Sequence, residues 1–257
     1  MNIPFLNTFR SEWLKKKGTA AAWLVVIGGF FIPVIILLGR VYYFDSLAAR
    51  HTDPNAWVAV FTTCWKQMAI LLLPFGVILA TSLITQLEFR NNTWKQTHTA
   101  PQRLTSLFFA KLLVILIMLL QFFALFNLGV YLVVALPSLA FPSIPYPDAP
   151  FPFAMVMKWN ATLFLASLPI VALQYLISLQ VRNFLVPLGV GIGLFIASLV
   201  GMSWQYSYTI PYIYCSGRFL LAEKLAGTVD LNLWAAGYFA LFTVAGYVLY
   251  MTKKEKG

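Results

Sequence analysis

The chain has 257 residues, of which 60% are hydrophobic and only 10% are charged, and its mean hydropathy is +0.79. A soluble domain carries about 25% charged residues, so this composition excludes an ordinary soluble protein and indicates a chain embedded in lipid. The net charge of +10 comes from short basic clusters beside apolar runs, a pattern typical of membrane proteins and unlike a nucleic-acid-binding module.

The first expected element is an amphipathic helix at residues 1–18. Four apolar side chains, Phe5, Leu6, Phe9 and Trp13, share one helical arc, and polar side chains lie away from it. This pattern predicts a helix that lies in the membrane interface. A merely basic topogenic tail is the alternative.

Six apolar runs follow, each long enough to cross the hydrocarbon core. The first is longer than the core of a signal peptide, so we expect it to be retained as a span. We predict an all-α integral membrane protein, a single transmembrane domain over residues 1–257, with spans at residues 20–39, 67–85, 107–136, 159–179, 185–203 and 233–250.

The positions of Lys and Arg predict the orientation, because positive residues near span ends are retained in the cytoplasm. With the N-terminus inside, the inner segments hold twelve basic residues: Arg10, Lys15, Lys16, Lys17, Arg90, Lys95, Arg103, Lys111, Arg182, Lys253, Lys254 and Lys256. The outer segments hold six: Arg40, Arg50, Lys66, Lys158, Arg218 and Lys224. This ratio favours a multi-pass protein with both termini in the cytoplasm.

The connection between the second and third spans, residues 86–111, is the most polar stretch on the expected inner side. Its composition predicts a short surface helix, a turn at Pro101 and then the third span, with Lys111 reaching toward the headgroups. A solvated loop that simply obeys the charge bias is the alternative interpretation.

Polar and small residues within the spans predict how the helices pack. The amides of Gln121, Asn127, Asn160 and Gln174 are expected to form hydrogen bonds between helices more readily than to bind a substrate. The fifth span carries small residues at four-residue intervals, a face suited to another span of the same chain or to a homodimer interface: Gly189, Gly193, Ala197 and Gly201.

Two connections on the expected outer side have unusual compositions. Residues 137–153 are rich in proline and aromatic residues, which predicts an ordered loop at the interface. Residues 209–222 are too apolar for a loop and too short for a crossing, so we expect a re-entrant or interfacial hairpin before the last span. Cys64 and Cys215 are expected to be separate thiols, with a disulfide as the alternative.

This order of parts resembles the permease subunits of type-2 ABC exporters, which have six spans and an amphipathic helix before the first. In that family the inner segment after the second span runs from an acidic residue through a Gly-Thr or similar pair to a proline, a basic residue and a lysine. The corresponding residues of this chain are Glu88, Asn92, Thr93, Trp94, Pro101, Arg103 and Lys111. Asparagine stands where glycine is usual, a mild change because asparagine also tolerates left-handed backbone geometry.

The resemblance implies that a coupling helix docks into a separate cytoplasmic ATPase. The implied contact residues are Glu88, Arg90, Asn92, Thr93, Trp94, Lys95, Pro101 and Arg103. The chain has no phosphate-binding loop of the G-x-x-x-x-G-K-[ST] form, so ATP and magnesium are expected in the partner, with no catalytic residue, metal or cofactor in this chain.

The function that the resemblance implies is ATP-driven export of an amphiphilic substrate, such as a peptide antibiotic, a lipid or a drug. The permease would sit in the bacterial cytoplasmic (inner) membrane with a second permease copy or homologue, and the bacteriocin or bacitracin immunity branch looks closest in size. A haem or lipid exporter is the near alternative. A secondary carrier is more distant, because no carboxylate sits clearly at mid-bilayer. An intramembrane enzyme is poorly supported, since His51 and His98 fall on opposite sides.

Overall fold

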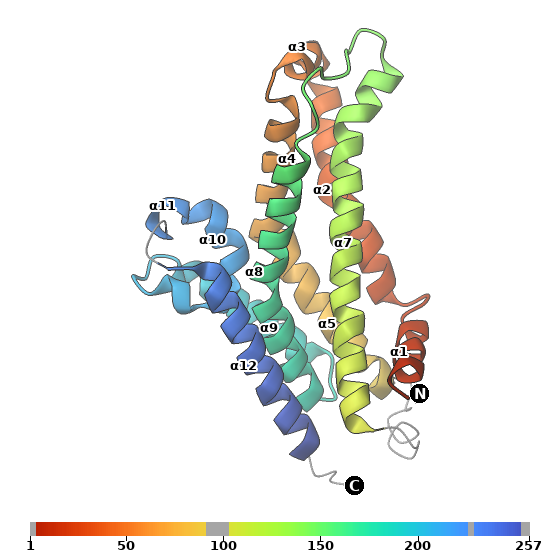
Figure 1. Cartoon of the computed structure of the whole chain (residues 1–257), viewed down its shortest axis with the longest axis vertical. Coiled ribbons are helices and arrows are strands. Elements are labelled where there is room, and N and C mark those ends of the chain that lie inside the picture. Colours follow the sequence, from red (N-terminus) through yellow and green to blue (C-terminus); the bar gives the residue numbers. More distant parts are fainter. Residues whose placement is uncertain (1–3, 91–102, 226–228, 253–257) are drawn as a thin grey trace.

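The fold is a bundle of helices, seen in a computed structural model that describes residues 4–90, 103–225 and 229–252 (Figure 1). No strand occurs in these ranges, which confirms the predicted all-α class. The long elements are α1 (Pro4–Lys15), α2 (Ala20–Tyr42), α4 (Ala56–Gln67), α5 (Leu73–Arg90), α7 (Leu104–Ala140), α8 (Phe153–Gln180), α9 (Leu185–Gly201) and α12 (Leu231–Thr252). The short ones are η1 (Phe44–Ser46), α3 (Leu47–Thr52), η2 (Met68–Leu72), η3 (Ser207–Thr209), η4 (Pro211–Ile213), α10 (Tyr214–Leu220) and α11 (Ala222–Leu225).

Five helical stretches are long and apolar enough to cross a membrane, and the shorter α9 is a sixth apolar helix. Its 17 residues rise about 26 Å, slightly less than the roughly 30 Å hydrocarbon core. The second stretch starts at Ala56, upstream of the expected residue 67, because α4, η2 and α5 follow one another without a break. The element η2 is a π-helical turn, and the ribbon changes direction there (Figure 1).

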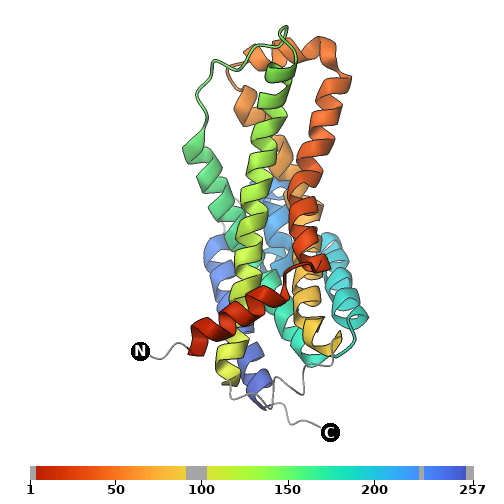
Figure 2. The same cartoon turned by 90° about the vertical axis from the view of Figure 1, so that its right-hand side faces the viewer.

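The two ends of the bundle are built from different elements. The helix α1, the start of α7 and the end of α12 lie together at the lower end in both views, whereas α3 and the stretch at 141–152 lie at the upper end (Figures 1 and 2). We refer to these as the α1 end and the α3 end. Figure 2 shows α1 lying crosswise to α7.

Helix α7 is central to the packing and meets α2 where both helices carry glycine. A methyl group added at Gly29 would lie 2.9 Å from Leu125 Cβ, and one added at Gly129 would lie 2.8 Å from Pro33 Cγ. Both distances are too short for a carbon contact, so the glycines permit this close approach of the two helices.

Much of the apolar surface of the outer helices has no partner within the described part of the chain. On α2, Trp23 and Leu38 are more than half exposed, and so are Leu233 and Val244 on α12. Continuous apolar surface of this extent is not stable in water, so these faces indicate contact with lipid or with another membrane subunit.

The apolar stretch before α12 forms the short helices η3, η4, α10 and α11, and its re-entrant or interfacial position stays a prediction. Its middle is buried: Tyr212, Ile213, Tyr214 and Cys215 are at most 2% exposed, and the segment packs against α8, α9 and η2. Cys215 and the equally buried Cys64 are free thiols, which confirms the expectation of two separate cysteines.

Candidate functional site at the α1 end

The helix α1 turns its polar side toward the protein. Thr8 and Glu12 are buried, whereas Phe5, Leu6 and Leu14 are each at least 40% exposed. A soluble helix would be oriented the other way, so this arrangement fits a helix whose apolar side rests in lipid. The predicted apolar arc is thus present, with Phe9 and Trp13 partly buried against the core.

Charged side chains fasten α1 to α7. Glu12 is 6% exposed and pairs with Lys15 on its own helix, and its second oxygen lies 4.0 Å from Nζ of Lys111, which is 3% exposed. The prediction that Lys111 extends to the headgroups is therefore wrong: its ammonium group is enclosed and faces a carboxylate. Sequence reasoning missed Glu12, although a single acidic residue in a basic amphipathic helix was a usable signal.

A second link joins the end of α1 to the middle of α7. Lys16 Nζ donates to Gln121 Oε1 at 2.7 Å and lies 3.5 Å from the centre of the Trp13 ring. A cation over an aromatic face is stabilised by the ring quadrupole, most strongly where water is excluded. The amide of Gln121 therefore holds this end of α1 against α7, and the Trp13 ring stabilises the ammonium group that makes the link.

The predicted coupling segment begins and ends at this end of the bundle. Glu88 and Arg90 belong to the last turn of α5, and Arg103 is the exposed residue that precedes the first turn of α7. The remaining predicted contact residues, Asn92, Thr93, Trp94, Lys95 and Pro101, lie outside the described residues.

The base of α5 is also attached to the connection between α8 and α9. Gln86 is buried, and its Nε2 donates to the backbone carbonyl of Val181 at 2.8 Å. Buried amides that lose such a partner cost free energy, so this bond holds the last turn of α5 in place beside residues 181–184. Sequence analysis placed Gln86 in the polar segment but gave no sign of its partner.

The polar amides within the helices form bonds between helices, as predicted. Asn127 on α7 and Asn160 on α8 exchange hydrogen bonds of 2.9 and 3.1 Å. Gln174 on α8 donates to Ser82 Oγ at 2.9 Å and to the Pro187 carbonyl at 2.6 Å, which ties together α5, α8 and α9.

Three of the four small residues predicted on α9 fall on a face that points away from the rest of the described chain. Nothing described lies within 4 Å of a methyl group added at Gly189 or Gly193, and both are exposed, as is Ala197. Gly201 alone of the predicted four approaches another segment, since a methyl group there would lie 2.6 Å from Ile210 Cδ1. The close contact of α9 with its own chain is instead made at Gly191, where such a methyl group would lie 2.6 Å from Gln174 Oε1.

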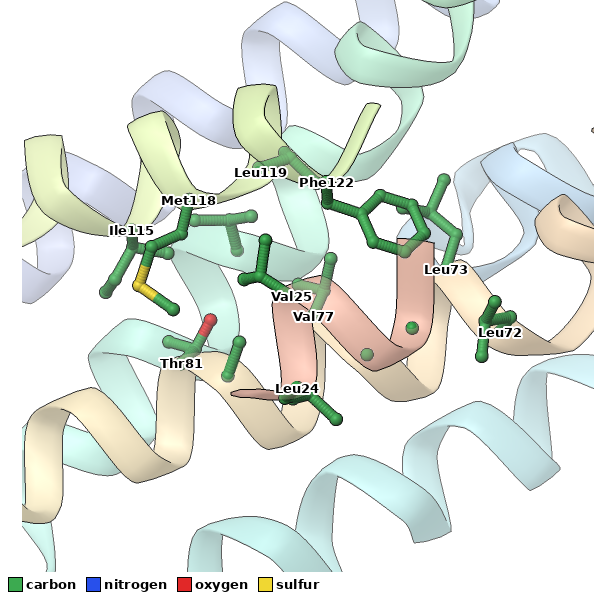
Figure 3. Close-up of a pocket in the computed structure, with 14 residues that line it drawn as sticks. Leu24, Val25, Leu72, Leu73, Val77, Thr81, Ile115, Met118, Leu119 and Phe122 are labelled. Atoms are coloured by element: carbon green, nitrogen blue, oxygen red, sulfur yellow. The ribbon is translucent and has the colours of Figure 1, made fainter. Parts of the chain in front are cut away.

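A small cavity lies between α2, η2, α5, α7 and α8 (Figure 3). Its volume is about 50 Å³, and Thr81 contributes the only polar side chain among its fourteen lining residues. Pockets for drug-sized ligands measure roughly 300–1,000 Å³, so this cavity is too small to hold an amphiphilic substrate in this conformation.

The helices and the polar end together define a multi-pass membrane protein with fixed links between its interfacial helix and its spans. The family model described as ABC-2 family transporter protein matches residues 8–198, which is most of the chain. The chain therefore belongs to the ABC-2 transporter family and is a membrane component, not the ATPase. Comparisons with curated proteins and with solved structures gave no match.

Proposed function

We propose that this chain is the permease of an exporter in which a separate cytoplasmic ATPase docks at residues 88–103 and drives an amphiphilic substrate outward. ATP and magnesium would be bound by that partner. The observation that carries the proposal is the set of links at the α1 end. They join α5 to the α8–α9 connection and α7 to α1, and α5 and α7 are the helices on either side of residues 91–102.

A force applied by an ATPase to residues 91–102 would be transmitted to several helices. Residues 91–102 connect α5 to α7, so a force on them acts on both helices. Gln86 passes movement of α5 to Val181, and the Glu12–Lys111 pair passes movement of α7 to α1. An ATPase docked at this point would therefore move several helices together, whereas a solvated loop would have no need of such links.

The proposed working unit is a dimer of permeases. In each copy the α1 end and both termini would face the cytoplasm. The cavity within one chain is too small for a substrate, so we place the path between two copies. The open face of α9 at Gly189, Gly193 and Ala197 allows close approach of a second helix.

Gly193→Leu should then weaken dimerisation in detergent, and Gly237→Leu, at an equally open position of α12, should not. Equal dimer fractions for both variants would remove α9 from the interface.

The substrate is proposed to be amphiphilic, a peptide antibiotic, lipid or drug, because the exposed faces available to it are apolar. An ion-coupled carrier gains no support, since the seven Asp and Glu residues in the described part of the chain lie at helix ends, in the short helices or in connections. The bacitracin or bacteriocin branch and the haem or lipid exporters differ only in the molecule moved.

The test of ATPase docking uses two pairs of matched variants. Trp94→Ala should lower the copurification of the ATPase and the substrate-stimulated hydrolysis of ATP by roughly tenfold or more, as expected for loss of an aromatic anchor worth about 2 kcal/mol. Glu88→Ala should act in the same direction. The controls are Trp204→Ala and Asp45→Ala, which are exposed positions away from the α1 end. If Trp94→Ala and Glu88→Ala match their controls while the protein is inserted normally, residues 88–103 do not dock an ATPase.

A further inference from the structure

A groove of about 530 Å³ lies between α2 and α4 near the α3 end. Its volume is in the range of real ligand sites, unlike that of the cavity within the bundle. Its charged lining residues are Arg40, Arg50 and Asp53, and its aliphatic lining residues include Ile35, Ile36 and Val60.

Arg40 is the most unusual of these residues. It sits in the last turn of α2 with 9% of its surface exposed, and neither its Nε nor its Nη2 has a hydrogen-bond partner among the described residues. The partial negative charge at the C-terminal end of α2 offers some compensation. It does not supply acceptors for the two enclosed nitrogens, and a buried guanidinium without acceptors is costly.

The single carboxylate in the groove does not neutralise this charge. Asp53 Oδ1 accepts a hydrogen bond from the backbone of Asn55 at 2.7 Å, and no ion pair joins Asp53 to Arg40 or Arg50 in the described part of the chain. Two arginines and one aspartate leave the lining with a net charge of +1 (2 − 1). The groove therefore offers guanidinium donors to an anion.

A second charged groove offers a comparison with a partly compensated arginine. It measures about 410 Å³ and contains Lys158, Arg218 and Asp230. There Arg218 Nη2 donates to Asn232 Oδ1 at 2.7 Å, although its Nε is buried without a partner among the described residues. Burial lowers the pKa of Arg218, and Cys215 and the carboxylate of Asp230 oppose that shift. Arg40 has no corresponding amide partner, which is why the first groove is the better ligand site.

The order of residues along the groove distinguishes a lipid from a free anion. On α2, Arg40 lies toward the helix end, and Ile35 and Ile36 lie one turn deeper in the span. On α4, which runs the opposite way, Val60 lies deeper than Ala56. The groove thus changes from cationic at the end of the bundle to aliphatic toward its middle, as the head and tail of an amphiphile require.

We propose that this groove binds a membrane amphiphile with an anionic phosphate head group, which Arg40 and Arg50 hold while an acyl chain lies along Ile35, Ile36 and Val60. Guanidinium groups bind phosphate oxygens through paired, charge-assisted hydrogen bonds. The site does not depend on the proposed export function, since a lipid bound there would be held whether or not the chain transports it.

The test uses the purified full chain in detergent, with bound lipid counted by native mass spectrometry during titration. The probes are phosphatidylglycerol, phosphatidylcholine and inorganic phosphate. We expect phosphatidylglycerol to bind at least about tenfold more tightly than phosphatidylcholine, and inorganic phosphate to compete only weakly because it lacks a chain for the aliphatic part. Inorganic phosphate competing as well as the lipid does would overturn the lipid assignment and leave a site for a small anion only.

The variants separate the groove from general attraction to the basic protein. Arg40→Gln should reduce phosphatidylglycerol affinity about tenfold or more, and Arg50→Gln, at an exposed position that does not threaten folding, should reduce it by a smaller factor. Lys66→Gln removes the same charge at an exposed site outside the lining and should leave affinity unchanged. Unchanged binding in both arginine variants, or equal loss in Lys66→Gln, contradicts the proposal.

Discussion

The α1 end and the α3 end of the bundle treat their charged side chains in opposite ways. At the α1 end, Glu12, Lys16 and Lys111 have partners on another helix or within the same helix. At the α3 end, Arg40 is nearly as buried, yet two of its nitrogens face no acceptor within the described residues. A buried charge with partners fixes helices relative to each other, whereas one without partners marks a place for a molecule that the chain itself does not supply.

The strongest way to break this comparison is to remove the carboxylate of the α1 end. Glu12→Gln removes the carboxylate that faces the buried Lys111 and should lower the free energy of unfolding by on the order of 3 kcal/mol. Thermal unfolding in detergent measures the loss. The exposed Glu223→Gln on α11 is the control, and adding Lys111→Met to Glu12→Gln should recover part of the stability. A melting temperature equal to that of the control would show that the pair fixes nothing.

A smaller effect is expected from pH at the α3 end, where His51 on α3 is buried. Its Nδ1 donates to the carbonyl of Pro145 at 2.9 Å and lies 3.1 Å from Ser138 Oγ, while Nε2 has no partner in the described chain. Burial lowers the pKa of His51 below its ordinary value of 6.5, the Pro145 carbonyl opposes that shift, and the charge of Arg40 adds to it.

The sign of the pH effect follows from that lowered pKa. A histidine that is harder to protonate when folded contributes stability above its unfolded pKa, and the contribution is lost as pH falls through the folded value. The melting temperature should therefore fall more steeply between about pH 8 and about pH 5 in the native chain than in His51→Asn, whose amide can replace the Nδ1 donor. Parallel curves would show that His51 does not titrate with unfolding.

The smallest expected effect is on the stability of a variant at the α3 end. Arg40→Gln removes a buried charge whose Nε and Nη2 have no acceptor among the described residues, so in lipid-free detergent we expect no loss of stability beyond about 0.5 kcal/mol, in contrast to Glu12→Gln. The same thermal unfolding experiment measures it. A loss as large as that of Glu12→Gln would mean that Arg40 is a structural residue and that the two ends do not differ in this respect.

The sequence was informative where the signal was local. Apolar runs predicted every membrane-length helix, because burial in lipid requires a continuous apolar stretch. It was less informative at the helix ends: α4 starts at Ala56 and α8 at Phe153, because the helices continue through Lys66 and Lys158, which were assigned to the outer segments.

Long-range pairing was not predictable from one sequence. Glu12 and Lys111, or Gln86 and Val181, are brought together only by the packing of helices that are distant in the chain. The orientation of α9 is a similar case, because four-residue spacing identifies a face of small residues without showing whether that face points inward. The structure turns Gly191 inward and leaves Gly189 and Gly193 open.

The most direct test of the central claim, that the α1 end faces the cytoplasm and the α3 end the outside, is cysteine labelling in intact cells. In a chain with Cys64 and Cys215 replaced by Ala, Asn92→Cys should react with a membrane-impermeant maleimide only after the cells are permeabilised. Asp148→Cys, in the stretch at the α3 end, should react in intact cells. Labelling of both positions from the same face would contradict the account, because no partner ATPase could then reach residues 88–103 while the Arg40 groove opened to the outer leaflet.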